Sequence, residues 1–236
     1  MPAVGVLFAL VHAPSLGPAS WVPVAEQLTA SGYDVAVPSL AGFAVAGPPY
    51  TRRLVELAAR QVRAGPRDRV VLVLHSGSGV FAPYLAEEIA AHEVAVVFAD
   101  ATVPSELPGA RVVSTESLGF LGEIASHGMV PPWPKWWPDD RLSRLFPDEA
   151  SWRAVTREAS ALPLGFFEEL LPPTPDSWPT CRPGYLCFSE PYKHQADAAR
   201  RRGWPVRDLH GGHLHMLVSP ADVADAITVM AAGQAG

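Results

Sequence analysis

The sequence predicts an α/β protein built on a doubly wound, mainly parallel sheet of six strands. Continuous apolar runs such as 70–74 are typical of strands that are buried on both faces, as in a parallel sheet. These runs alternate with segments of helical periodicity, and right-handed crossovers join such alternating elements into a parallel sheet. An irregular stretch at about 104–183, rich in tryptophan and proline, interrupts the alternation as an inserted segment.

The strands are predicted where β-branched and other apolar residues follow one another for several positions. In chain order they are expected at 4–11, 33–38, 70–74, 94–99, 184–189 and 205–209. The third run leads directly into Ser76, and the fourth ends at Asp100. Both polar residues therefore belong at the carboxyl edge of the sheet.

The helices are predicted from apolar spacing and from the residues that begin and end helices. Ser20 is placed as the N-cap of the first helix, which Ser31 and Gly32 end, and Ser219 precedes Pro220 at the start of the last. The helices are expected at 20–30, 51–64, 80–91, 195–202 and from 220 onward.

The segment at about 104–183 is expected to form a lid within a single domain that spans 1–236. Helical fragments are expected at 116–127, 139–146, 149–159 and 164–170. Long irregular segments between sheet strands often carry function, and the alternative is an excursion that only covers one edge of the sheet. Three aromatic residues are expected to wall an apolar pocket there: Trp133, Trp136 and Trp137.

Composition excludes several classes of protein. The 236-residue chain is 48% hydrophobic and 18% charged, which suits a globular domain with a sizeable core. A net charge of −6 argues against nucleic acid and anionic membranes as partners. Cys181 and Cys187 form neither a disulfide framework nor a metal-ligand set. The apolar start lacks a basic flank, and no apolar run approaches the ~20 residues of a membrane span. We expect a soluble cytoplasmic protein, monomeric or homodimeric.

Ser76 lies in a glycine-flanked turn between the third strand and the following helix. A serine at such a turn presents its hydroxyl at the sheet edge, near helix N–H groups that favour negative charge. The alternative is a loop that only connects strand and helix, or one that cradles a phosphate. Ser78, two residues into the helix, is a second and less favoured candidate nucleophile.

Three histidines follow the last strand, at the edge where doubly wound sheets bind ligands. They are His210, His213 and His215. A serine nucleophile needs a base within reach and an acid that orients the base. The pair His213 and His215 could instead begin a metal site, but no Cys/His/Asp cluster supplies further ligands at suitable spacing. The base is the better interpretation, and neither a metal nor another cofactor is expected.

With these motifs the chain resembles the α/β-hydrolase superfamily over almost its whole length. The resemblance lies in the strand, His12 loop and helix at the start, the elbow at 74–79, the insertion after the fourth strand, and a glycine–histidine pair shortly before Pro220. It implies that Ser76 is the nucleophile and that His213 is the general base. It also implies that the N–H of Gly77 is one donor of the oxyanion hole, and that His12 and His215 lie at the substrate pocket.

The chain departs from the family pattern in three places. Leu74 stands two residues before the serine, where a small residue is usual. Pro14 stands where the first loop usually supplies the second oxyanion donor, and proline has no N–H, so Ala13 or Ser15 is expected to take over. The acid is Glu190 or Asp100; Glu190 follows the fifth strand, where the family usually places the acid, and it is preferred.

The leading hypothesis is a serine hydrolase that cleaves a neutral, largely apolar ester, thioester or lactone. The alternative keeps the fold and uses the serine–histidine pair for proton transfer, as a lyase, isomerase or cyclase that acts on a small natural-product-like substrate. A binding protein without catalysis is a third possibility, because a fold does not determine a function.

Overall fold

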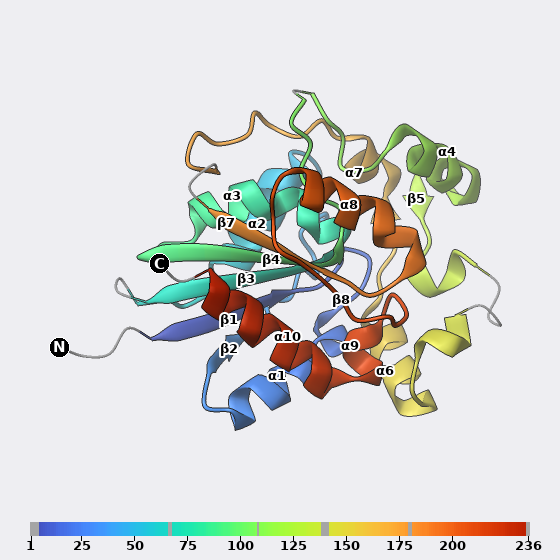
Figure 1. Cartoon of the computed structure of the whole chain (residues 1–236). Helices are drawn as coiled ribbons and strands as arrows, with labels where there is room; N and C mark the ends of the chain where they lie inside the picture. The colour runs from blue at the N-terminus through green and yellow to red at the C-terminus, as the bar shows by residue number, and fades with distance from the viewer. Residues whose placement is uncertain (1–4, 66–67, 108, 138–141, 179–180, 235–236) are drawn as a thin grey trace.

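Six parallel strands form the central sheet, in the order β2-β1-β3-β4-β7-β8 (Figure 1). The computed structural model of the chain describes residues 5–65, 68–107, 109–137, 142–178 and 181–234. The strands are β1 (Val6–Val11), β2 (Asp34–Ala36), β3 (Arg69–Ser76), β4 (Glu93–Ala101), β7 (Arg182–Cys187) and β8 (Val206–Asp208). The predicted doubly wound sheet of six strands is confirmed.

Side chains of β3 alternate between two hydrophobic clusters, one on each face of the sheet. Leu72 and Leu74 belong to one cluster, Val71 and Val73 to the other, and all four are fully buried. This period of two is the geometry of an extended strand. The uninterrupted apolar run at 70–74 is thus explained by helices that cover both faces.

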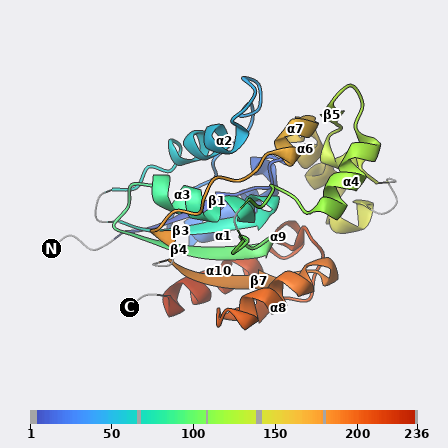
Figure 2. The same ribbon diagram turned by 90° about the horizontal axis from the view of Figure 1, so that it is seen from above.

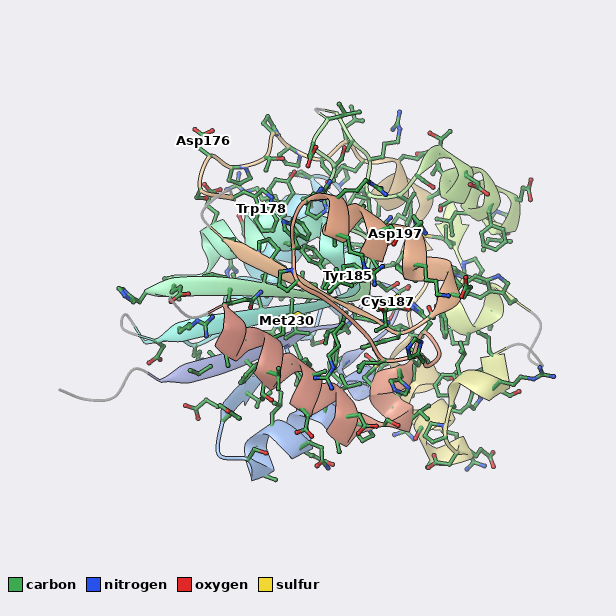
Figure 3. The ribbon with its side chains drawn as sticks, viewed as in Figure 1. Asp176, Trp178, Tyr185, Cys187, Asp197 and Met230 are labelled. Carbon is green, nitrogen blue, oxygen red and sulfur yellow. The ribbon has the colours of Figure 1, made fainter. Side chains whose placement is uncertain are left out.

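Helices α2 (Tyr50–Ala59), α3 (Ala82–Glu88) and α8 (Lys193–Arg201) cover one face, while α1 (Val22–Ala30) and α10 (Pro220–Gly233) cover the other (Figures 1 and 2). On β7, Tyr185 and Cys187 pack into the first cluster, whereas Met230 of α10 belongs to the second (Figure 3). A Cβ at Gly184 would lie 2.4 Å from the Met230 sulfur, so a larger residue at 184 would require the Met230 side chain to move.

The helix ends differ from those predicted. Ser20 lies inside a short 3-10 helix, η1 (Pro18–Ser20), and donates its hydroxyl to Gly17, so Trp21 and not Ser20 precedes α1. Pro220 begins α10 as expected, but Ser219 makes no side-chain capping bond. No helix in the described part of the chain is both long and apolar enough to cross a membrane.

The inserted segment lies beyond the carboxyl ends of the strands, at one end of the sheet (Figures 1 and 2). It contains α4 (Thr115–Ile124), β5 (Met129–Val130), η3 (Trp133–Lys135), η4 (Ser143–Leu145), α6 (Glu149–Glu158), β6 (Leu162–Pro163) and α7 (Leu164–Glu168). β5 and β6 pair antiparallel in a small second sheet. Residues 139–141, the start of one expected helical fragment, lie outside the described residues.

Two carboxylates of the insertion contact the first turns of helical segments in the core. Glu158 accepts a hydrogen bond from the Ala19 N–H at 2.7 Å, in η1. Glu169 accepts from the Tyr50 and Thr51 N–H groups, each at 2.6 Å, where α2 begins. A carboxylate at a helix N-terminus satisfies N–H groups that lack intrahelical partners and interacts favourably with the helix dipole. These contacts attach the insertion to the sheet domain.

Candidate active site

The side chains of Ser76, His213 and Asp100 form one hydrogen-bonded chain at the carboxyl edge of the sheet. His213 Nε2 lies 3.1 Å from Ser76 Oγ, and His213 Nδ1 lies 2.8 Å from Asp100 Oδ2. Ser76 ends β3, Asp100 lies near the end of β4, and His213 precedes the short helix α9 (His215–Val218). A hydroxyl, a base and a carboxylate within hydrogen-bond reach have the geometry of a nucleophilic triad.

Ser76 is held in a strained backbone conformation. Its φ of 57° and ψ of −130° are rarely adopted by a residue with a side chain. The chain turns sharply there from β3 into the 3-10 helix η2 (Gly77–Phe81), and a Cβ at Gly79 would lie 2.1 Å from the Thr102 carbonyl oxygen. Glycine at 79 therefore lets η2 approach β4 closely enough for the turn to form. Leu74, the departure noted in the elbow, is fully buried in the core.

Asp100 reaches His213 because of a bulge in β4. The register passes from His75 opposite Ala99 to Ser76 opposite Ala101, so Asp100 is left unpaired, and its φ is 47°. Bulges redirect side chains and are frequent beside active sites. The displaced residue is fully buried at the sheet edge.

Four donors surround the buried Asp100 carboxylate. Phe188 and Ser189 donate their backbone N–H groups to Oδ1 at 2.9 and 3.0 Å. The Ser189 hydroxyl, at 2.5 Å, and His213 share Oδ2. A buried carboxylate is tolerable only when hydrogen bonds replace its hydration, and this set does so.

Glu190, the preferred acid in the sequence analysis, lies elsewhere. It begins the 3-10 turn η6 (Glu190–Tyr192), its side chain is 78% exposed, and its carboxylate pairs with Lys193 at 2.5 Å. The structure therefore places Asp100, and not Glu190, against His213. The family resemblance favoured the loop after β7, but the bulge in β4 brings the Asp100 carboxylate to His213.

Ser78, the second candidate nucleophile, is fully buried and directed into the backbone. Its hydroxyl lies 2.8 Å from the His75 carbonyl oxygen and 3.2 Å from that of Val11. This places it in the packing between β1 and the elbow, away from the Ser76–His213 pair. The Ser78 hydroxyl thus bonds to backbone carbonyls, whereas the Ser76 hydroxyl lies within hydrogen-bond distance of His213.

Tyr192, which the sequence analysis did not single out, completes the surroundings of Ser76. Its hydroxyl oxygen lies 3.1 Å from Ser76 Oγ, and its ring stacks on the His213 ring with centroids 4.7 Å apart and an interplanar angle of 7°. Burial raises the pKa of this phenol to about 12. The available signal was its place in the loop after the fifth strand, at the edge where ligands bind.

A sequence model described as "Alpha/beta hydrolase family" matches residues 8–226. The chain belongs to the alpha/beta hydrolase family. No curated protein sequence matches it. Solved structures with the same fold include polyneuridine aldehyde esterase (16% identity, TM-score 0.71, covering 96% of this chain and 99% of that one). Tomato methylketone synthase I (17%, 0.66, 99% and 100%) and a pyrethroid hydrolase from Sphingobium faniae JZ-2 (18%, 0.67, 97% and 98%) are also similar.

His75 contacts both the backbone and the ring of His213. It is fully buried, its Nε2 lies 2.9 Å from the His213 carbonyl oxygen, and its ring lies 4.5 Å from that of His213. Because a carbonyl oxygen only accepts, His75 Nε2 carries the proton. Burial, and in addition the nearby His213, lower the pKa of His75 well below its ordinary value, so the ring is neutral.

Gly77, the residue after the serine, lies close to Pro14 of the first loop. Gly77 is the first residue of η2, so its N–H has no partner within that helix. A Cβ at Gly77 would lie 3.9 Å from Pro14 Cδ, so the proline ring lies beside the residue that begins η2, and proline has no N–H to donate. The Ala13 carbonyl accepts from Leu16 N–H at 2.9 Å, and no partner is found among the described residues for the Ser15 N–H.

Both ring nitrogens of His12 are hydrogen-bonded to backbone groups, so the side chain does not face an open pocket. It is 1% exposed; its Nδ1 lies 2.7 Å from the Ala13 carbonyl oxygen, and its Nε2 accepts from the Leu40 N–H at 3.2 Å. Burial lowers the pKa of His12 to about 4. His215, the other expected pocket residue, packs its ring against Phe188 with centroids 5.8 Å apart.

The expected pocket tryptophans form one aromatic cluster in the insertion. Trp133 is buried, Trp137 stacks on Phe120 at 6.0 Å, and the Trp136 indole N–H donates to the Pro131 carbonyl at 2.7 Å. The insertion also contacts the loop that carries His213, because a Cβ at Gly212 would lie 3.1 Å from the Leu145 side chain.

Among the described residues, no group of three or more His, Cys, Asp or Glu side chains is placed to hold a metal ion.

Proposed function

We propose that this protein is a serine hydrolase that cleaves a neutral, largely apolar ester, thioester or lactone. The observation that carries the proposal is the continuous chain from Asp100 through His213 to Ser76 at a strained strand–helix turn. Strain at a serine that faces a base is typical of a nucleophile elbow, and is costly for a residue that only connects two elements.

The reaction proceeds in two steps. Ser76 Oγ attacks the carbonyl carbon as its proton passes to His213 Nε2, and the carbonyl electron pair moves onto oxygen. Collapse of this oxyanion expels the alcohol or thiol, which takes the proton from His213, and leaves an acyl ester on Ser76. Water then gives a proton to His213 and attacks that ester, and the acid is released as Ser76 regains its hydrogen.

Asp100 serves the base in both steps. Its buried carboxylate holds the proton of His213 on Nδ1, which leaves Nε2 free to accept the serine proton, and it stabilises the imidazolium that forms. His75 fixes the backbone of the same residue through the His213 carbonyl. The imidazole therefore needs little reorganisation before the attack.

The aromatic cluster of the insertion supports an apolar substrate. Indole and phenyl rings bury large apolar areas, and Trp133, Trp136 and Trp137 lie together in the segment beyond the carboxyl edge. We assign this segment the role of a lid that excludes water from the acyl group. The likeness to an esterase and a pyrethroid hydrolase is in line with ester chemistry.

A second candidate is a proton-transfer enzyme on the same fold, a lyase, isomerase or cyclase without an acyl intermediate. The observation that favours it is Pro14 beside Gly77, because a site with one oxyanion donor fewer stabilises a tetrahedral intermediate less well. The likeness to methylketone synthase I shows that the fold is not restricted to proteins named hydrolases.

The test is covalent labelling together with burst kinetics. We expect a fluorophosphonate probe to label the wild-type chain and not Ser76→Ala, while Ser78→Ala is labelled. We also expect p-nitrophenyl butyrate to give a burst of one p-nitrophenol per chain if deacylation is the slower step. Labelling that persists in Ser76→Ala contradicts the nucleophile. Turnover of a natural-product-like substrate without labelling at Ser76 favours the proton-transfer alternative.

A further inference from the structure

We propose that Tyr192 is a further catalytic residue, whose phenol O–H donates a hydrogen bond to the oxyanion beside the Gly77 N–H. The inference rests on the proposed serine chemistry and adds to it the second donor. It assigns a role to a side chain that neither the triad nor the elbow requires.

The position of the phenol is determined by ring stacking and by a backbone hydrogen bond. The Tyr192 ring is stacked parallel on the His213 ring. The backbone N–H of Tyr192 donates to the Ser189 carbonyl at 3.1 Å. Ser189 is itself bound to Asp100 through its N–H and its hydroxyl. Tyr192 is thus held by two of the groups that hold the triad, and its hydroxyl has little freedom.

The direction of its hydrogen bond follows from the triad. The Asp100 carboxylate holds a proton on His213 Nδ1, so His213 Nε2 accepts a hydrogen bond from the Ser76 hydroxyl. The Ser76 oxygen then has only lone pairs to offer to Tyr192, which lies 3.1 Å away. Tyr192 is therefore the donor before the reaction begins.

The same donor is within reach of the oxyanion. When Ser76 Oγ bonds to the carbonyl carbon, this oxygen and the developing oxyanion are attached to one carbon atom. Two oxygens on one tetrahedral carbon are close neighbours, so a phenol 3.1 Å from the first contacts the second when the carbonyl oxygen is bound on the Tyr192 side of the serine, as the proposal requires. The negative charge moves onto the second oxygen, so the hydrogen bond is stronger in the transition state than in the free enzyme.

The site lacks the usual alternative. Pro14 faces Gly77 and has no N–H to donate. A buried phenol fills this need as a neutral donor, because burial raises the pKa of Tyr192 to about 12 and the hydroxyl keeps its proton. Removal of one oxyanion donor lowers kcat by about 10²–10³ in other acyl-transfer sites.

The test is Tyr192→Phe, which keeps the stacked ring and removes only the hydroxyl. We expect kcat for p-nitrophenyl butyrate to fall about 10²-fold, with KM changed less than about 3-fold. An alkyl trifluoromethyl ketone, which forms a charged hemiketal on the serine, should lose affinity by a similar factor. The corresponding unfluorinated ketone, a ground-state analogue, should not. Tyr84→Phe is the matched control, because the Tyr84 hydroxyl bonds to the Pro172 carbonyl and plays no part in the site.

Each other outcome overturns the proposal. Tyr192→Phe could keep the wild-type rate, the wild-type ketone affinity and the Ser76-dependent burst. In that case the proposed hydrolase function still holds, and the second oxyanion donor is a backbone N–H at 13–15. A faster variant means that the phenol holds the serine inactive. A wild-type chain without any Ser76-dependent burst overturns this inference and the proposed function together.

A measurement on the wild-type chain tests the proposal even if the Tyr192→Phe variant fails to fold. In a crystal structure of the wild-type trifluoromethyl hemiketal, the Tyr192 oxygen is expected within about 3.2 Å of the hemiketal oxygen, the range of a hydrogen bond. A phenol that has turned away from this oxygen overturns the assignment.

Discussion

The hydroxyl of Ser189 and the imidazole of His213 donate to the same oxygen of Asp100, Oδ2, at 2.5 and 2.8 Å. Ser189 thus fixes the carboxylate that contacts His213. Removal of one hydrogen bond to a buried charged group costs about 1.5–3 kcal/mol. We expect Ser189→Ala to lower kcat/KM for an activated ester about tenfold. The control is Ser105→Ala, whose exposed hydroxyl bonds to the Leu107 carbonyl and is not part of the hydrogen-bonded chain of Ser76, His213 and Asp100. An unchanged kcat/KM would show that the two backbone N–H groups suffice.

The two candidate acids are separated by paired substitutions. Asp100→Asn keeps the size of the side chain but no longer holds the correct histidine tautomer, and the corresponding change in a serine protease lowers kcat about 10⁴-fold. Glu190→Gln should leave kcat nearly unchanged, because Glu190 faces solvent and Lys193. Steady-state kinetics on both variants decide the matter, and a large loss in Glu190→Gln would contradict the geometry.

Acid should destabilise the fold through its buried histidines. The pKa of His12 is lowered from 6.5 to about 4 by burial, so the unfolded chain binds more protons than the folded one between these values. The free energy of unfolding therefore falls as the pH drops from about 6.5 to about 4, by roughly 3 kcal/mol from His12. His75 acts in the same direction. Urea unfolding of the wild type and His12→Gln across this range should show a shallower pH slope in the variant.

The contact of Glu169 with α2 is expected to stabilise the attached insertion. Glu169→Gln replaces a carboxylate that accepts from both Tyr50 and Thr51 by an amide with one acceptor oxygen. The loss should be about 1 kcal/mol, as for a helix N-cap. Faster amide hydrogen exchange at the first turn of α2 would report it. Glu168→Gln, at an exposed position one residue earlier, is the control and should not change this exchange.

Pro14→Ala tests whether a backbone donor can replace the phenol. Alanine restores an N–H opposite Gly77. In the Tyr192→Phe background, Pro14→Ala is expected to recover about tenfold of the lost kcat, because one oxyanion donor is worth about 10²–10³. In the wild-type background the gain in kcat should be smaller, since the Tyr192 phenol already donates to the oxyanion. Equal gains in both backgrounds would indicate that the two groups act independently.

Local patterns in the sequence determine the sheet, the elbow and the place of the base. Buried parallel strands require unbroken apolar runs, so six strands can be recognised from residue types alone. Glycines around Ser76 indicate a tight turn, and strand direction brings Ser76 to the same sheet edge as the histidines at 210–215. These inferences need only nearest neighbours along the chain and the general rules of strand connection. The choice of His213 among the three histidines comes from the resemblance to the α/β-hydrolase family.

Tertiary structure alone decided which carboxylate meets His213 and what else reaches Ser76. Asp100 is redirected by a bulge, which depends on the pairing of β3 with β4 and leaves no mark in a single strand. Tyr192 reaches the serine because its ring stacks on a histidine 21 positions later in the chain (213 − 192). The bulge and the stacking depend on contacts between distant segments. The residue pattern of one segment indicates whether that segment is a helix or a strand. It does not indicate the strand register or the side-chain packing, because both depend on neighbouring segments.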